Sequence, residues 1–253
     1  MRPRLLVTLT LLATVAGTAV GQRFLSGIVW PEPPVVTPGE GTAPPSDALV
    51  LFGGKDFDEW NGAKGWKADD DGGFTAKGAI ATKKGFGDFQ LHLEFASPKV
   101  VKGSGQGRGN NGVGLMGGRY EIQVLDSYNN KTYPEGSAAS VYNQRPPMVN
   151  ASRKPGEWQT YDIAFTTPRF DKGGKVTKPG FVTVIHNGVV VQNHTEILGT
   201  TDFDRENVYA KHADKLPIVL MYHGDGVRFR NIWIRELVEP VGRAGGKKGV
   251  EGK

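Results

Sequence analysis

GNNGVGLMGGRYEIQVLDSY, residues 109–128, is the stretch that decides the fold we predict. Its first half is rich in glycine and asparagine, which tolerate positive φ angles and let other groups approach the backbone closely. In its second half Glu121 and Gln123 are polar, and the residues directly before and after each of them are apolar. This period of two predicts a β-strand with one face against a core. The polar face must then meet water, a partner or a ligand.

A β-bulge after Val124 would add a second carboxyl group to that polar face. Simple alternation places Asp126 on the apolar face, but one extra residue between Val124 and Asp126 returns it to the side of Glu121. Two carboxyl groups on one row can divide acid and base catalysis between them if their environments separate their pKa values. The alternative is the solvated outer face of an antiparallel sheet, which requires no function.

The rest of the chain has the same strand periodicity. Residues 187–188 are Asn-Gly between two β-branched runs, a strong signal for a β-hairpin. No convincing amphipathic helix occurs in residues 48–239, so we predict an all-β fold, a two-sheet antiparallel jelly roll. In the last strand, simple alternation places one set of residues on one face and their neighbours on the other: Val227, Phe229, Asn231, Trp233 and Arg235 against Arg228, Arg230, Ile232, Ile234 and Glu236.

The ends of the chain differ in composition from its body. Two arginines followed by a short apolar run and small residues predict a signal peptide, which would be removed before Gln22. The alternative is an uncleaved membrane anchor, although the run is short for a span. No other segment could cross a bilayer, so we expect an exported protein (periplasmic, cell-surface or extracellular) without stable membrane insertion after signal removal. The predicted organisation is a signal peptide (1–21), a Pro-rich linker (22–47), the jelly-roll domain (48–239) and a disordered basic Gly/Lys tail (240–253).

Charge and cysteine content exclude several classes of function. The net charge of +5 misleads, because residues 240–253 hold four basic residues and one acidic residue, while residues 1–47 are balanced. The nearly neutral body gives no electrostatic reason to expect nucleic acid as a ligand. The absence of cysteine excludes disulfides, thiolate metal sites and cysteine nucleophiles.

Four segments, in this order along the chain, together resemble the 3-keto-disaccharide hydrolase domain family. They are LFGGKDF (51–57) with Trp60, NGVG (111–114) with YEIQVLDSY (120–128), PGEWQTYDI (155–163), and HG (223–224) with VRFRNIWIR (227–235). The resemblance implies a concanavalin A-like sandwich and an enzyme that cleaves the glycosidic bond of 3-keto-glycosides. The layout is also similar to laminarinase-type glucanases, whose catalytic strand carries three acidic residues. Here the middle residue is the amide Gln123, which weakens a direct transfer of double-displacement chemistry.

A ketone at carbon 3 of a sugar acidifies the hydrogen at carbon 2, so a base and an enolate stabiliser can cleave the bond by elimination followed by hydration. For this chemistry we assign Glu121, Asp126 and His223 as catalytic candidates. The candidates for substrate binding are Gln123, Arg230, Asn111, Tyr142, Asn110 and Arg228. The metal ligands are unknown. An oxygen-rich row would suit calcium, magnesium or manganese, but nothing in the spacing requires a cation.

Two other functions fit the same pattern. The first is a lectin-like, non-catalytic carbohydrate-binding module, because jelly rolls serve both classes. The second is a surface or structural protein with an anchored N-terminus. A lectin has no need of two carboxyl groups on one row, so substitution of Glu121 and Asp126 separates it from an enzyme. Both the enzyme and the lectin imply a carbohydrate partner.

Overall fold

The computed structural model describes residues 27–244 as two compact units. One unit spans Pro34–Glu239, and the other holds the described residues on either side of it. In that smaller unit β1 (Ile28–Val29) pairs antiparallel with β16 (Arg243–Ala244). Strand β16 lies inside the segment 240–253, which the sequence predicts to be a disordered tail. The predicted signal peptide lies outside the described residues. The part of the chain that the structure describes contains no helix with the length and hydropathy of a membrane span.

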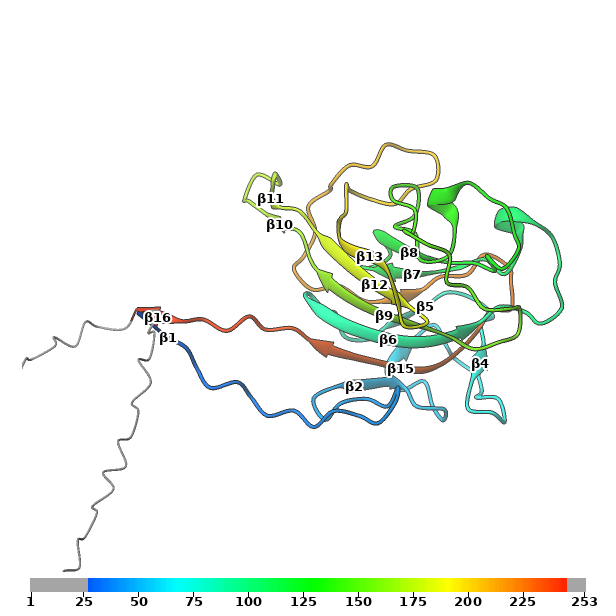
Figure 1. The fold of residues 1–253 in the computed structure, drawn as a ribbon, viewed down its shortest axis with the longest axis horizontal. Helices are drawn as coiled ribbons and strands as arrows, with labels where there is room; N and C mark the ends of the chain where they lie inside the picture. Colours follow the sequence, from blue (N-terminus) through cyan, green and yellow to red (C-terminus); the bar gives the residue numbers. More distant parts are fainter. Residues whose placement is uncertain (1–26, 245–253) are drawn as a thin grey trace, which may run out of the picture. The chain divides into compact units, whose positions relative to one another are not determined.

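Pro34–Glu239 forms two antiparallel sheets, and Figure 1 shows β6, β9 and β12 side by side with β7 and β8 in the next layer. The first sheet has seven strands in the order β13-β12-β9-β6-β15-β2, with β4 beside β15. Its strands are β2 (Leu49–Phe52), β4 (Phe74–Thr75), β6 (Phe89–Ala96), β9 (Gln159–Thr166), β12 (Phe181–His186), β13 (Val189–Glu196) and β15 (Arg228–Glu236).

The second sheet has five strands in the order β3-β5-β14-β7-β8. They are β3 (Trp60–Asn61), β5 (Ile80–Thr82), β7 (Asn111–Leu115), β8 (Tyr120–Val124) and β14 (Val219–Leu220). A separate hairpin and two short 3-10 helices complete the unit: β10 (Arg169–Phe170), β11 (Val176–Lys178), η1 (Gly105–Gly107) and η2 (Pro134–Gly136).

One hydrophobic core lies between the two sheets. It joins residues of β6 and β9, such as Leu91 and Ile163, to residues of β7 and β8, such as Val113 and Ile122, all of them fully buried. The alternating patterns therefore place their apolar faces inward, and the all-β sandwich is confirmed. The finer jelly-roll connectivity stays a prediction. The hairpin at Asn187 and Gly188 is present, and both residues have positive φ angles, as a type I′ turn requires.

The last strand departs from simple alternation. Asn231 has a φ of 45°, and the register of β15 against β6 shifts between Arg230 and Trp233. This irregularity reverses the face of every later residue, so that Ile232 and Ile234 join Val227 and Phe229 in the core. The two-face prediction for this strand is therefore wrong beyond Arg230.

A strap formed by residues 34–47 covers the outer face of the seven-stranded sheet. Thr42 accepts hydrogen bonds at its carbonyl oxygen from the indole of Trp233 (3.0 Å) and the side-chain amide of Asn231 (2.9 Å). Asp47 forms an ion pair with Arg235 at 2.7 Å. The compact unit thus begins before residue 48, and the proline-rich segment packs on the sheet instead of only linking.

Candidate functional site

The outer face of β7 and β8 supplies the floor of a pocket. The two strands pair with Gly112 opposite Gln123 and Gly114 opposite Glu121. Because Val113 and Ile122 point into the core, these four positions face away from it. The glycine-rich half of the stretch that predicts the fold therefore leaves room beside the two polar side chains of its second half.

This pocket, called the Glu121 pocket here, has a volume of about 430 Å³. Side chains from four separate loops complete it around the floor. Its lining includes Gln106, Asn110, Glu121, Gln123, Tyr133, Tyr142, Thr201, Asp202, Phe203, Met221 and His223.

Glu121 lies at the floor with its side chain almost fully buried, at 6% exposure. Its backbone is anchored, because its amide donates to Thr201 Oγ1 (2.8 Å) and its carbonyl oxygen accepts from Tyr142 N (3.0 Å). Its carboxyl group has no hydrogen-bond or ion-pair partner among the residues that the structure describes. Burial without such a partner raises the pKa of Glu121 to about 8. At neutral pH the carboxyl is therefore mainly protonated, and it can give up or take a proton near physiological pH.

Gly112 makes the room for that carboxyl group. A Cβ atom at position 112 would lie 2.2 Å from Glu121 Oε1 and 2.8 Å from Met221 Sδ, which is closer than such atoms can approach. Only a glycine at this position leaves the carboxyl where it is.

Gln123 is held by a hydrogen-bond network that leaves its acceptor oxygen free. Its Nε2 donates to Gln106 Oε1 at 2.9 Å, and Gln106 Nε2 donates in turn to Thr132 Oγ1 and the Gly136 carbonyl oxygen, both at 2.8 Å. Asn110 Nδ2 donates to the Gln106 carbonyl oxygen at 2.9 Å. The oxygens Gln123 Oε1 and Asn110 Oδ1 are buried and have no partner. Gln123 and Asn110 both line the pocket, so each brings an acceptor oxygen without a partner to the pocket wall, and hydroxyl groups of a ligand suit such acceptors.

Two tyrosines and a histidine offer hydrogen-bond donors to the same space. The hydroxyl groups of Tyr133 and Tyr142 lie 2.6 Å apart. Burial, the hydrogen bond with Tyr133 and the nearby Glu121 raise the pKa of Tyr142, so its phenol stays neutral. His223 lies at the exposed rim, where partial burial of its ring lowers its pKa although the Asp225 carboxylate acts in the opposite direction. Its imidazole is therefore mainly neutral at pH 7.

Asp126 does not join Glu121 and Gln123. It lies beyond the end of β8, 2% exposed, where it accepts a hydrogen bond from Arg108 Nε at 2.7 Å and another from Tyr128 N at 3.2 Å. It lines a different pocket. The expected pair of carboxyl groups on one row is therefore absent, because the strand ends before a bulge could return Asp126 to the row.

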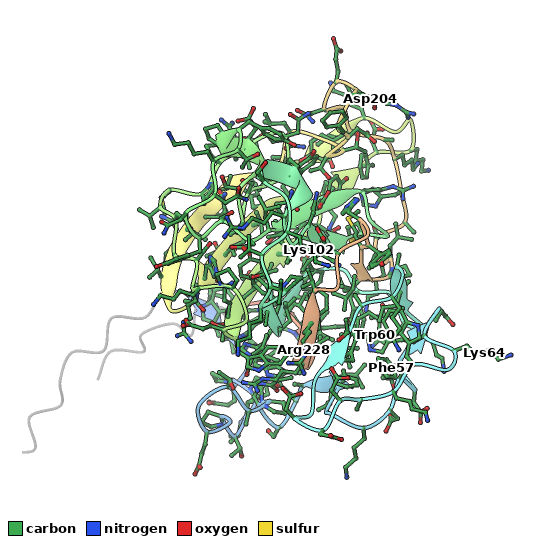
Figure 2. All side chains as sticks on the ribbon, turned by 90° about the vertical axis from the view of Figure 1, so that its right-hand side faces the viewer. Phe57, Trp60, Lys64, Lys102, Asp204 and Arg228 are labelled. Carbon is green, nitrogen blue, oxygen red and sulfur yellow. The ribbon has the colours of Figure 1, made fainter. Side chains whose placement is uncertain are left out.

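Three predicted substrate-binding residues also lie away from the Glu121 pocket. Arg228 and Arg230 belong to β15 of the other sheet, where they pair with Asp71 (2.5 Å) and Glu94 (2.7 Å). Figure 2 shows Arg228 on a different part of the molecule from the loop that carries Asp204, next to the pocket residue Phe203. Asn111 points into the core side of β7 and is fully buried. The structure thus brings together Glu121, Gln123, Asn110, Tyr142 and His223.

Several pocket residues could not be predicted from the sequence. Gln106 lies in η1, within a glycine-rich loop before β7 that has no strand or helix periodicity. Tyr133 and Phe203 lie in long loops without periodicity, and Phe203 is 75% exposed. An aromatic residue in a polar loop is a weak signal, since only its place at the pocket rim gives it meaning.

The predicted row offers a cation fewer carboxylates than expected. Within residues 27–244 no three or more acidic or histidine side chains converge on a point where a metal ion could lie. The expected row loses its second carboxylate because Asp126 is held by Arg108. A divalent cation at this row, calcium, magnesium or manganese, stays a prediction from the sequence.

Comparison with models of protein families identifies the family of this chain. Residues 47–235 match the model of the 3-keto-alpha-glucoside-1,2-lyase-like domain. The chain belongs to this family. The match covers both sheets and the Glu121 pocket, and it confirms the relationship predicted from the four segments.

Solved structures give further relatives of this family member. A protein from Parabacteroides distasonis ATCC 8503, assigned as a glycosyl hydrolase, is 48% identical, with a TM-score of 0.78 over 85% of this chain and 95% of that one. A second protein from the same organism with the same assignment is 26% identical, with a TM-score of 0.51 over 75% and 99%. A third, 19% identical with a TM-score of 0.54 over 76% and 94%, supports the fold alone. A search of curated proteins gave no match.

Proposed function

We propose that this protein cleaves the glycosidic bond of 3-keto-α-glucosides by elimination followed by hydration. The observation that carries the proposal is Glu121, a buried carboxyl without a partner at the floor of a polar pocket, with a pKa of about 8. The family description names a lyase-like domain acting on this class of glucoside, and the 48% identical relative is assigned as a glycosyl hydrolase. Export of the protein, which the N-terminal sequence predicts, is part of the same proposal.

The reaction needs one residue that moves a proton and several that hold the sugar. Ionised Glu121 takes the proton from carbon 2, and the electron pair of that bond forms an enolate with the carbon 3 ketone. When the enolate collapses, the carbon 3 ketone is restored, a double bond forms between carbons 1 and 2, the bond from carbon 1 to the glycosidic oxygen breaks, and the departing oxygen takes a proton from water. Addition of water across the double bond then gives the free 3-keto sugar. A base whose pKa lies close to the working pH is effective in the first step.

The pocket groups match the remaining needs of this reaction. Gln123 Oε1 and Asn110 Oδ1 accept hydrogen bonds from sugar hydroxyls. The Tyr133–Tyr142 pair and neutral His223 are donors for the enolate oxygen and the departing oxygen. A retaining or inverting glycosidase would instead require two carboxyl groups flanking the bond. Asp126 is held away by Arg108, and Asp202 already accepts from Thr200 Oγ1 at 2.7 Å.

Product analysis tests this proposal directly. The protein is incubated with a 3-keto-disaccharide and with the unoxidised parent sugar, and the products are separated by chromatography. We expect cleavage of the keto sugar alone, and loss of that cleavage in the Glu121→Gln variant. Saturable binding of both sugars without cleavage of either would contradict the proposal and favour the lectin-like module.

A further inference from the structure

A second pocket of about 310 Å³ adjoins the Glu121 pocket. Its lining includes Pro98, Val100, Val101, Lys102, Gly224 and Asp225. The two pockets share a wall, because Asn110 and His223 line one of them, and their chain neighbours Gly109 and Gly224 line the other. A hydrogen bond from Asn110 N to Asp225 Oδ2, 2.8 Å long, fixes this wall.

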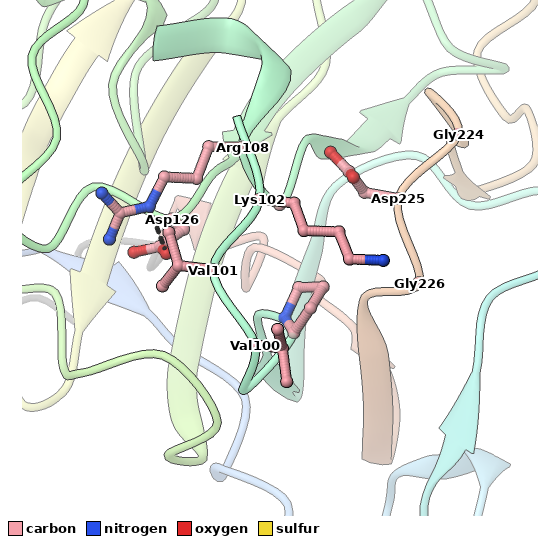
Figure 3. Close-up of a pocket in the computed structure, with 10 residues that line it drawn as sticks. Val100, Val101, Lys102, Arg108, Asp126, Gly224, Asp225 and Gly226 are labelled. Atoms are coloured by element: carbon pink, nitrogen blue, oxygen red, sulfur yellow. Dashed lines mark hydrogen bonds and ion pairs between the residues drawn. The ribbon is translucent and has the colours of Figure 1, made fainter. Parts of the chain in front are cut away.

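The second pocket combines an apolar side with free polar groups. Val100 and Val101 are exposed apolar side chains, 70% and 48% accessible. Figure 3 shows Lys102 reaching across the pocket toward the segment of Asp225 and Gly226, with the Arg108–Asp126 ion pair on the other side. Lys102 forms no ion pair within the described part of the chain, and Asp225 uses only one carboxylate oxygen for Asn110.

These groups match the two kinds of surface that a pyranose ring presents. Its apolar face can pack against the valines, while its hydroxyl groups accept from the Lys102 ammonium and donate to Asp225. The ion pair between Arg108 and Asp126 is already satisfied, so it serves as a rigid wall. Gly224 adds no side chain, and a Cβ at that position would meet open space.

We propose that the second pocket binds the sugar unit that leaves the reaction, through the Lys102 ammonium, the Asp225 carboxylate and the side chains of Val100 and Val101. The inference rests on the proposed function, in which the Glu121 pocket holds the 3-keto unit. Lys102 is then a specificity residue for the leaving unit.

A binding comparison with two ligands tests this inference without relying on turnover. The ligands are 3-keto-trehalose, which carries a leaving sugar, and methyl 3-keto-α-glucoside, which carries only a methyl group. Their dissociation constants are measured by calorimetry in a Glu121→Gln background, with and without Lys102→Met. The matched control is Lys99→Met, an exposed lysine three positions away that does not line the pocket.

We expect Lys102→Met to raise the dissociation constant of the disaccharide about tenfold, the typical effect of losing one hydrogen bond to a charged group. The dissociation constant of the methyl glycoside should change less than twofold, and the control Lys99→Met should leave both dissociation constants unchanged. Val100→Trp, a substitution at an exposed site, should block the disaccharide by filling the pocket and spare the methyl glycoside.

Equal loss for both ligands, no loss for the disaccharide, or no binding of the disaccharide at all would overturn the inference. Failure of the proposed function gives a different result, because wild-type protein would then leave both ligands uncleaved whatever their dissociation constants.

Discussion

Glu121 is an acid that the fold keeps neutral by removing water, without supplying an opposite charge. Its pKa is near 4.5 in an unfolded chain and about 8 in the folded protein. The folded state therefore binds the proton more tightly between these values. The stability that the protonated carboxyl contributes is fully present below about pH 4.5 and is lost as the pH rises through about 8.

Replacement of Glu121 by glutamine should therefore change how stability depends on pH. One pKa unit corresponds to about 1.4 kcal/mol, so the wild-type protein should lose up to about 5 kcal/mol relative to Glu121→Gln across this range. Urea denaturation at pH 5 and pH 9 measures the difference. Glu157→Gln, at an exposed position, is the control and should follow the wild type. Parallel curves for Glu121→Gln and the wild type would show that Glu121 is not held neutral.

The same pKa predicts the pH dependence of catalysis. If ionised Glu121 is the base, kcat/KM for methyl 3-keto-α-glucoside should rise about tenfold per pH unit below pH 8 and then level off. Initial rates from pH 6 to pH 9.5 measure this profile. A flat profile would assign the proton transfer at carbon 2 to another group.

Gly112 determines where that carboxyl lies. Gly112→Ala should displace the Glu121 side chain, abolish turnover and lower the free energy of unfolding by about 1–3 kcal/mol, because the added methyl group has no space. Gly107→Ala is the matched control, since a Cβ there meets nothing within 4 Å. Activity assays and urea denaturation compare the two variants, and an active Gly112→Ala protein would contradict the geometry.

At the scale of the strand, Asn231 both turns the chain and joins it to the strap. Its φ of 45° is unfavourable for most side chains, and its amide donates to the Thr42 carbonyl oxygen and to Glu94 Oε1. Asn231→Gly should lose the hydrogen bonds while keeping the backbone geometry. Asn231→Ala should lose the hydrogen bonds and also make the positive φ unfavourable. It should therefore be about 1 kcal/mol less stable than the glycine variant in urea denaturation. Equal stability of the two would show that the backbone is not strained there.

The strands could be predicted because alternation and turn chemistry are local properties. The core faces of β6 and β8 and the turn at Asn187 follow directly from neighbouring residues. The irregularity at Asn231 could not be predicted. The sequence of β15 fits both simple alternation and an alternation that reverses after Arg230, and only pairing with β6 selects the second. The predicted position of Asp126 on the row of Glu121 is wrong because its ion-pair partner, Arg108, lies on a separate loop, and no local sequence pattern connects the two residues.

At the scale of the whole molecule, the strap extends the compact unit to Pro34, whereas the composition of the sequence places the start of the domain at residue 48. Removal of residues 1–33 should leave the urea midpoint unchanged, since Pro34–Glu239 is compact by itself. Removal of residues 1–47 should lower the midpoint, because His92 and Trp233 lose their cover and Arg235 loses Asp47. Equal midpoints for the two truncations would show that the strap adds no stability.

The pocket as a whole was only partly visible in the sequence. Its floor lies on one hairpin and could be predicted from the stretch around Glu121. Its walls come from loops that are distant in the chain, such as those carrying Gln106, Tyr133 and Phe203. Their meeting depends on the packing of the sandwich, which no local signal encodes.

The bare floor of the Glu121 pocket also sets a direction for the evolution of substrate size. Gly112 and Gly114 already present the smallest residue against Glu121 and Met221, which line the pocket, and the main chain there cannot be removed. A side chain added at either position would push Glu121 or Met221 toward the pocket, so substitution can make the pocket shallower but never deeper. Descendants of this protein that accept bulkier sugars must therefore change the length or course of the surrounding loops, while those that become more selective need only a single methyl group.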